Sequence, residues 1–321
     1  MKAAWKLQWK PQWIRPATVL FAATIPVNEK AFRFALAEAA KHKACLILFN
    51  AYDTMMASTV QASGIVYYDF DGAQLEAKRS LEPLAERARR AGVPCRVEVR
   101  PGLPVEQILS LAREFVVDRI VMGTRSPGTL GKIFAGSVAE EVLRKSPVPV
   151  SVIGPNAVDG AYRQYAVRRI LCGVSHLKSA SPVVTFAAKL AKQYNARLTL
   201  MHVIPEQAHT TVSIETAMQI EHEMLTMIPP GMTDLDAEAM ATSGDPANEI
   251  LYRAHALLTD LIVLSAHNAS MLESVSRNGV VYKVIAGTQC PVLTLSPIVL
   301  AAAGAQKEQP ESVETYLAGV F

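Results

Sequence analysis

The sequence is poor in the residues that signal a disulfide-bonded or metal-binding protein. Only four cysteines occur among its 321 residues, at positions 45, 95, 172 and 290, and none forms a Cys-x-x-Cys pair. Each lies in or beside a stretch predicted to be a strand. We therefore interpret them as small core residues in a reducing compartment, and predict neither a disulfide framework nor a metal site.

Charge of one sign and long apolar runs are lacking as well. The formal net charge is only +3, and no Lys/Arg cluster is interleaved with aromatic residues, so no nucleic-acid partner is expected. No apolar run approaches the length of a membrane span, and the N-terminus lacks the apolar core of a signal peptide, which predicts a cytoplasmic protein. The length and the 50% hydrophobic content predict two packed domains.

Signatures of catalysis are also missing. The chain contains no Gly-x4-Gly-Lys-(Ser/Thr), no His-Glu-x2-His and no Gly-x-Ser-x-Gly. His222 lies between Glu221 and Glu223, but adjacent residues of a helix point in different directions, so we interpret this cluster as a solvated helix face. No nucleophile can be paired with a base, and the question of an enzymatic activity stays open.

From Thr18 onward the chain alternates short apolar runs with helical patterns. In the first half, strands are predicted at 19–23, 45–49, 95–99, 117–122 and 148–153, and helices at 29–41, at 73–90 and from Pro104. The stretch 52–70 is less regular. Strands that alternate with helices at this spacing predict a parallel, doubly wound α/β sheet.

The two halves of the chain repeat each other. Gly102-x-Pro104 recurs as Gly244-x-Pro246, which is 142 positions later. The same offset relates 108–109 to 250–251, 118–121 to 260–263 and 149–150 to 291–292. Matches at one fixed offset predict two copies of a single αβ domain.

One stretch has the pattern of an anion-binding loop. The apolar run 120–122 ends in Gly123, a loop with Arg125 and Lys132 follows, and Gly136-Ser137 then opens a helical pattern. Glycines let the backbone approach a ligand closely, and the free amides of a helix N-terminus favour an anion. Ser137 is equally suited to cap the helix, so its presence alone indicates no ligand.

This stretch resembles the Gly-x2-Gly-x9-Gly-(Ser/Thr) signature of the universal stress protein family, with Ser126 in place of the second glycine. The Gly-x-Pro helix openings and the Gly-Ser-Val-Ala-Glu-x-Val-Leu helix carry the resemblance further, over residues 18–295. It implies two tandem Rossmann-like domains of the adenine-nucleotide-hydrolase-like kind, each a five-stranded parallel sheet with flanking helices.

The resemblance also implies how the domains are arranged. We expect a first domain at 17–155, a linker at 156–167 and a second domain at 168–297. In relatives the last strands of two domains pair, so residues 148–153 and 292–295 are expected to pair within this chain and hide two sheet edges. That arrangement is an intramolecular pseudo-dimer. A homodimer and an unidentified protein partner stay open.

Family members that bind ATP use an aspartate after the first strand, backbone after the second strand, and the loop amides. In the first domain Thr24 replaces the aspartate, and it can donate a hydrogen bond but offers no carboxylate. Ala51 falls at the adenine position. The matching loop residues are Met122, Gly123, Ser126, Gly136, Ser137 and Val138. Arg125 and Lys132 either add charge to a phosphate site or are only solvated loop residues. Ser126 can replace glycine only where no positive φ is needed, and Pro127 restricts it further.

Three functions follow from this comparison. The resemblance implies a stress-response protein with ATP or AMP in the first domain, with Mg²⁺ as a companion of the nucleotide. Because Thr24 and Ser126 depart from the pattern, a protein-interaction module of the same fold that binds no nucleotide is the alternative. A hydrolase with weak ATPase activity is the third, and it would need a catalytic group that the sequence does not reveal.

The second domain has lost more of the pattern. Ser265 and Asn268 replace its loop glycines, Asn278-Gly279 replaces Gly-Ser, and Ser175 stands at the aspartate position. We interpret this domain as a structural or regulatory copy. His202 and His267 fall near the ligand position, but single histidines are more often hydrogen-bonded scaffold or surface residues than ligands.

The two ends of the chain fall outside the repeat. The basic arm 1–16 holds Trp5, Trp9 and Trp13, which would share one face of a helix that Pro11 interrupts. A membrane surface or a partner groove is one interpretation; an arm folded back on the body, or disordered in part, is the one we favour. The tail 298–321 is expected to be mobile.

Overall fold

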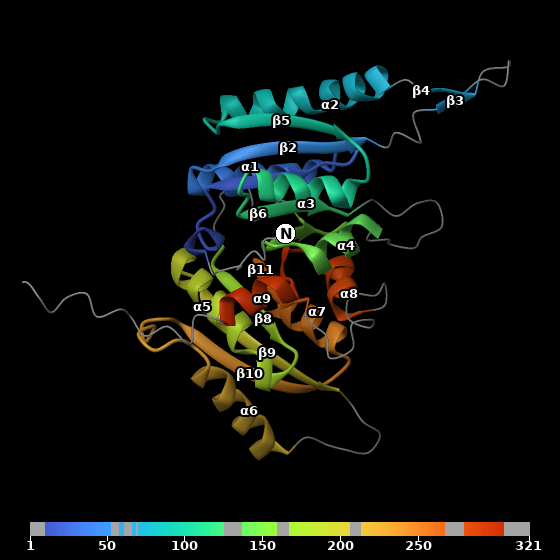
Figure 1. Ribbon diagram of the computed structural model, residues 1–321. Coiled ribbons are helices and arrows are strands. Elements are labelled where there is room, and N and C mark those ends of the chain that lie inside the picture. Colours follow the sequence, from blue (N-terminus) through green and yellow to red (C-terminus); the bar gives the residue numbers. More distant parts are fainter. Residues whose placement is uncertain are drawn as a thin grey trace, which may run out of the picture.

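A single ten-stranded sheet forms the centre of the molecule (Figure 1). The computed structural model describes residues 10–52, 58–60, 66–68, 70–124, 137–158, 167–205, 213–266 and 279–304. The strand order is β10-β9-β8-β11-β12-β7-β6-β1-β2-β5. Neighbouring strands run parallel except β12 and β7, which are antiparallel. Each half therefore has the order expected of a Rossmann-like sheet.

The first domain contains the five strands predicted from the sequence. Its main elements are β1 (Thr18–Ala22), α1 (Glu29–His42), β2 (Cys45–Tyr52), α2 (Phe70–Arg90), β5 (Cys95–Pro101), α3 (Pro104–Glu114), β6 (Arg119–Gly123), α4 (Ser137–Lys145) and β7 (Val150–Ile153). In the less regular stretch, β3 (Ser58–Val60) and β4 (Val66–Tyr68) form a small antiparallel ribbon.

The second domain repeats the first. Its elements are β8 (Arg169–Val174), α5 (Ser181–Tyr194), β9 (Arg197–Pro205), α6 (Ile214–Thr226), β10 (Ala237–Gly244), α7 (Pro246–Ala256), β11 (Leu261–Ser265), α8 (Val280–Gly287) and β12 (Val292–Leu295). Even unusual backbone angles recur: Val116 has φ 49° and Leu258, 142 positions later, has φ 50°. The repeat seen in the sequence is thus a repeat of structure.

The two halves join through their last strands, as predicted. Val292, Leu293 and Thr294 of β12 lie opposite Val152, Ser151 and Val150 of β7. The hydroxyl of Thr294 also donates to the carbonyl of Val150 at 3.0 Å. Apolar residues of both halves form one core cluster on the α3, α4, α7 and α8 side, so the pseudo-dimer has a shared core.

The chain ends are more ordered than the sequence suggested. Trp5 and Trp9 lie outside the described residues, but Trp13 closes a short helix, η1 (Pro11–Trp13), and is fully buried. Trp13 therefore cannot face a membrane. The expectation of a mobile tail from residue 298 was wrong for its first residues, because α9 (Pro297–Gly304) packs on α5 and buries Val299 and Leu300. The remainder, 305–321, lies outside the described residues.

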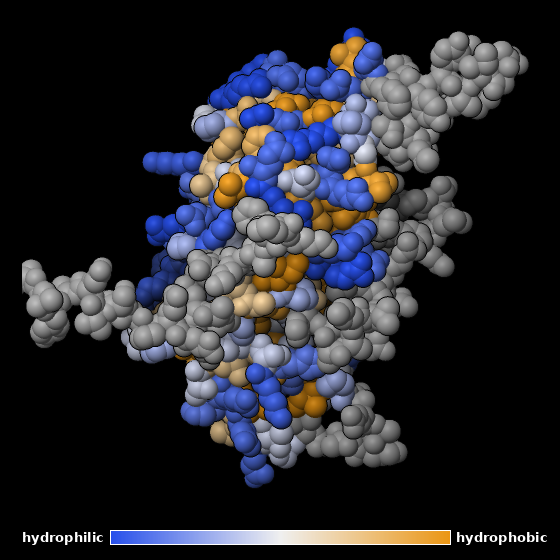
Figure 2. Space-filling model, in the orientation of Figure 1, coloured by the Kyte–Doolittle hydropathy of each residue, from blue (hydrophilic) through white to orange (hydrophobic). Residues whose placement is uncertain are grey.

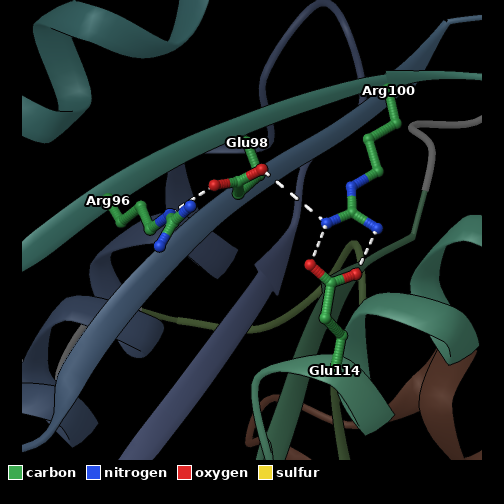
Figure 3. Close-up of polar contacts among 4 residues, drawn as sticks. All are labelled: Arg96, Glu98, Arg100 and Glu114. Carbon is green, nitrogen blue, oxygen red and sulfur yellow. Dashed lines mark hydrogen bonds and ion pairs between the residues drawn. The ribbon is translucent and has the colours of Figure 1, made fainter.

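Charged side chains line the outer strand of the first domain (Figure 3). Arg100 of β5 makes two hydrogen bonds, of 2.8 and 3.0 Å, with the carboxylate of Glu114, and Arg96 pairs with Glu98. Charges on an edge strand discourage pairing with another sheet. The surface at this end of the molecule is mostly hydrophilic (Figure 2).

Candidate functional site

The carboxyl ends of β1, β2 and β6 meet at one edge of the sheet. β1 lies between β2 and β6 and runs parallel to both. From β1 the chain adds β2 and β5 on one side of β1, and then β6 and β7 on the other side. The gap between β1 and β6 is therefore a topological switch point, the place where open α/β sheets bind their ligands. Thr24, Ala51 and Gly123 stand at these three strand ends.

The structure defines what each of the first candidates can offer. Thr24 is half-buried, and its hydroxyl donates to the carbonyl of Pro26 at 3.0 Å, so its oxygen is left to accept a hydrogen bond. Ala51 is half-buried near the end of β2. The side chain of Met122 is only 5% exposed and belongs to the core. Met122 can therefore contribute only its main chain to a ligand.

Gly123 is covered by a residue that the sequence analysis missed. A Cβ built on Gly123 would lie 2.5 Å from Cγ and Nδ2 of Asn28. Asn28 caps α1, since its Oδ1 accepts from the amide of Ala31 at 3.0 Å, and its Nδ2 donates to the carbonyl of Thr124 at 3.0 Å. Packing against Asn28 alone requires glycine at position 123. An asparagine just before a helical pattern was the available signal.

The remaining loop residues are described only in part. Arg125, Ser126, Lys132 and Gly136 lie outside the described residues. Ser137 begins α4, and Val138 is half-buried against the shared core. Because α4 connects the parallel strands β6 and β7, its N-terminus lies at the edge where β6 ends. The start of α4 thus lies at the same carboxyl edge of the sheet as Thr24 and Ala51.

At the corresponding edge of the second domain, polar side chains are in contact with one another and with the main chain. Ser175 follows β8 and Ser265 ends β11, and their hydroxyl oxygens are 3.5 Å apart. Nδ1 of His202 lies 2.8 Å from the carbonyl of Val174, and since a carbonyl only accepts, this nitrogen carries the proton. Asn50, at the matching place in the first domain, likewise donates to the carbonyl of Ala23 at 2.9 Å. His202 is therefore a scaffold residue, as predicted; His267, Asn268 and Asn278 lie outside the described residues.

The cysteine side chains are poor nucleophiles. Burial raises the pKa of Cys95 and of Cys290 to about 11, and that of Cys172 to about 12. Their thiols are protonated at neutral pH, which fits core residues. Within the described ranges, no three His, Cys, Asp or Glu side chains are grouped to hold a metal ion, and no helix has the length and apolarity needed to span a membrane.

Comparison with known proteins identifies the family. A model described as the universal stress protein family matches residues 18–154 and again 166–296. The chain therefore belongs to the universal stress protein family and carries two of its domains in tandem. A universal stress protein of Thermus aquaticus is 31% identical over 126 residues, which are 39% of this chain and 88% of the relative.

Solved structures show the same fold. The crystal structure of a universal stress protein from Archaeoglobus fulgidus covers 88% of this chain and 97% of its own, with a TM-score of 0.67 at 20% identity. A universal stress protein solved in complex with cAMP covers 42% of this chain and 95% of its own with 25% identity, but its TM-score of 0.32 adds nothing to the assignment of the fold.

Proposed function

We propose that this chain is a cytoplasmic stress-response protein that binds ATP or AMP at the switch point of its first domain, taken as residues 17–155. The second domain, 168–297, acts as a structural or regulatory copy without nucleotide. The observation that carries the proposal is the contrast between the two edges. In the first domain Thr24 directs its hydroxyl proton at Pro26 and Gly123 has no side chain, whereas the equivalent residues of the second domain, Ser175 and Ser265, are in hydroxyl contact.

The chemistry of the first edge suits a nucleotide. The main chain of Ala51 would meet the base. Thr24 would accept a hydrogen bond from a ribose hydroxyl, because its own proton is directed at Pro26. The N-terminus of α4 favours phosphate, and Arg125 and Lys132 add positive charge nearby in the sequence. Mg²⁺ would enter bound to the phosphates of ATP.

The first experiment is to denature freshly purified protein and assay the supernatant for adenine nucleotide, with titration calorimetry of ATP on the stripped and refolded protein beside it. Nucleotide released in an amount comparable with the protein supports the proposal. If the protein releases no nucleotide and shows no calorimetric binding of ATP, the proposal is overturned.

A matched pair of variants locates the site. Thr24→Asp supplies the carboxylate of ATP-binding relatives, and Ser175→Asp places the same group at the equivalent position of the second domain. We expect Thr24→Asp to tighten ATP binding about tenfold, since a hydrogen bond to a charged group contributes about 1.5 kcal/mol. Ser175→Asp should leave the affinity unchanged. An equal effect of both variants would argue against a first-domain site.

The alternative is an interaction module of the same fold that binds no nucleotide. One observation favours it: Asn28 accounts for Gly123 by packing alone, so that glycine need not mark a ligand. Absence of binding by the wild type and by Thr24→Asp would select this alternative. Hydrolysis of ATP by protein that binds it would instead point to a weak ATPase, and is tested by following phosphate release.

A further inference from the structure

Asn28 connects the first helix to the loop that follows β6. Its Oδ1 accepts from the amide of Ala31, and its Nδ2 donates to the carbonyl of Thr124, both at 3.0 Å. The orientation of the carboxamide is settled by its partners, because a backbone amide only donates and a carbonyl only accepts. A serine or an aspartate could cap the helix, but only a carboxamide makes both bonds.

Thr124 is the residue that this contact holds in place. It is the first residue after β6 and is buried, and its amide donates to the carbonyl of Ile153 at 3.0 Å. Its own carbonyl is taken by Asn28. Both main-chain polar groups of Thr124 are thus satisfied, one by the end of β7 and one by the cap of α1. The position at which the chain leaves β6 is therefore fixed.

The second domain shows that the fold does not need this link. Ala180 precedes α5 as Asn28 precedes α1, 152 positions earlier, and it makes no side-chain cap. Ala266 matches Thr124, and its amide donates to the carbonyl of Leu295 at 2.7 Å. The bond to the neighbouring strand is therefore common to both domains. The side-chain link to the helix cap has no counterpart between Ala180 and Ala266.

We propose that Asn28 is a positioning residue of the first-domain nucleotide site. It holds Thr124, where the chain leaves β6, and its side chain fills the space beside Gly123. This inference rests on the proposed function for its ligand part. The link between Asn28 and Thr124 is a property of the ligand-free protein and can be tested without nucleotide.

Asn28→Ser is the first test. Serine retains a neutral cap but is too short to reach the carbonyl of Thr124. In the ligand-free protein we expect hydrogen exchange at the amide of Thr124, here called loop exchange, to become about fivefold to tenfold faster, because the substitution removes one hydrogen bond. The calorimetric Kd for ATP should rise by a similar factor. Ser213→Ala, which removes the cap of α6, is the control and should change neither reading.

Asn28→Asp tests the link to Thr124 separately from the helix cap, through the pH dependence of loop exchange. At neutral pH its carboxylate caps α1 but repels the carbonyl of Thr124, so loop exchange should be fast relative to the wild type at the same pH. When the carboxyl group protonates in acid it regains a donor, and the difference should shrink.

The outcomes separate the two proposals. Unchanged loop exchange in both Asn28 variants would overturn the positioning role even if the wild type binds ATP. Faster exchange with an unchanged Kd for ATP would also overturn it. A wild type that binds no ATP would refute the proposed function, and with it the ligand role of Asn28, whatever the exchange data show.

Discussion

The main-chain oxygen of Trp13 accepts a 2.6 Å hydrogen bond from Nη2 of Arg119, which joins the N-terminal segment to β6 of the first domain. The indole of Trp13 packs in a core cluster built mostly from the second domain. Arg119 in turn pairs with Glu38 of α1 at 2.7 Å, and both side chains are almost completely buried. One residue of the N-terminal segment thus contacts both domains.

Replacing Trp13 should destabilise the whole molecule. Trp13→Ala removes a large buried side chain at this junction, and we expect a loss of about 3 to 5 kcal/mol in the free energy of unfolding. Urea denaturation followed by circular dichroism measures it. Gln12→Ala, at an exposed neighbour, is the control. A loss below about 1 kcal/mol, typical of a surface substitution, would contradict the packing of Trp13.

The buried pair of Glu38 and Arg119 has an apolar counterpart in the second domain. The equivalent positions are Leu190 and Leu261, both buried. Glu38→Leu alone should cost about 3 to 5 kcal/mol, because it leaves the Arg119 charge buried without its partner. The double variant Glu38→Leu/Arg119→Leu should be more stable than that single variant.

The same denaturation experiment decides this comparison. Arg119→Leu completes the double-mutant cycle, and its interaction term isolates the pair. If the double variant lost as much stability as the sum of both single variants, the two side chains would be uncoupled.

His42 makes stability depend on acidity. Burial, and then the charges of Arg119, Lys41 and Arg15, lower the pKa of His42 from 6.5 to about 4. Below pH 6.5 the unfolded chain therefore binds a proton that the folded protein resists. Stability should fall as the pH falls from 6.5 toward 4, and His42 should contribute no slope above that window.

His42→Gln tests this dependence, because glutamine can still bond to the Tyr194 hydroxyl, 3.0 Å from Nε2 of His42, but does not titrate. Its melting temperature should vary less between pH 6.5 and 4 than that of the wild type. His255→Gln, at an exposed histidine, should follow the wild type. Identical pH profiles for His42→Gln and the wild type would contradict the shift.

Gly154 is required where the domains meet. A Cβ at this position would lie 2.0 Å from the carbonyl oxygen of Ile285 in α8, and a backbone atom cannot move aside cheaply. We expect Gly154→Ala to cost about 3 kcal/mol or more. Gly231→Ala, where φ is +88° but no atom lies within 4 Å, measures backbone strain alone and should cost about 1 kcal/mol. Similar melting temperatures for the two variants would contradict a tight contact at Gly154.

Much of the fold could be predicted from the sequence, because its signals are local. Apolar runs and helical spacing report which face of each element is buried, and they predicted the strands and helices of the first domain to within a few residues. The repeat at 142 positions predicted a second copy of that domain. The family resemblance added the pairing of the last strands, which the register of β12 and β7 confirms. For the site, it placed Thr24, Ala51 and Gly123 at neighbouring strand ends.

The sequence by itself therefore determined the fold class, the duplication and the region of the candidate site. Only the tertiary structure decided that Asn28 covers Gly123, that Trp13 lies in a core and that the segment after β12 begins with a helix. These contacts join residues about a hundred positions apart, as Asn28 with Thr124 and Trp13 with Arg119. A local pattern shows that a side chain is buried, but the path of the folded chain decides what it is buried against.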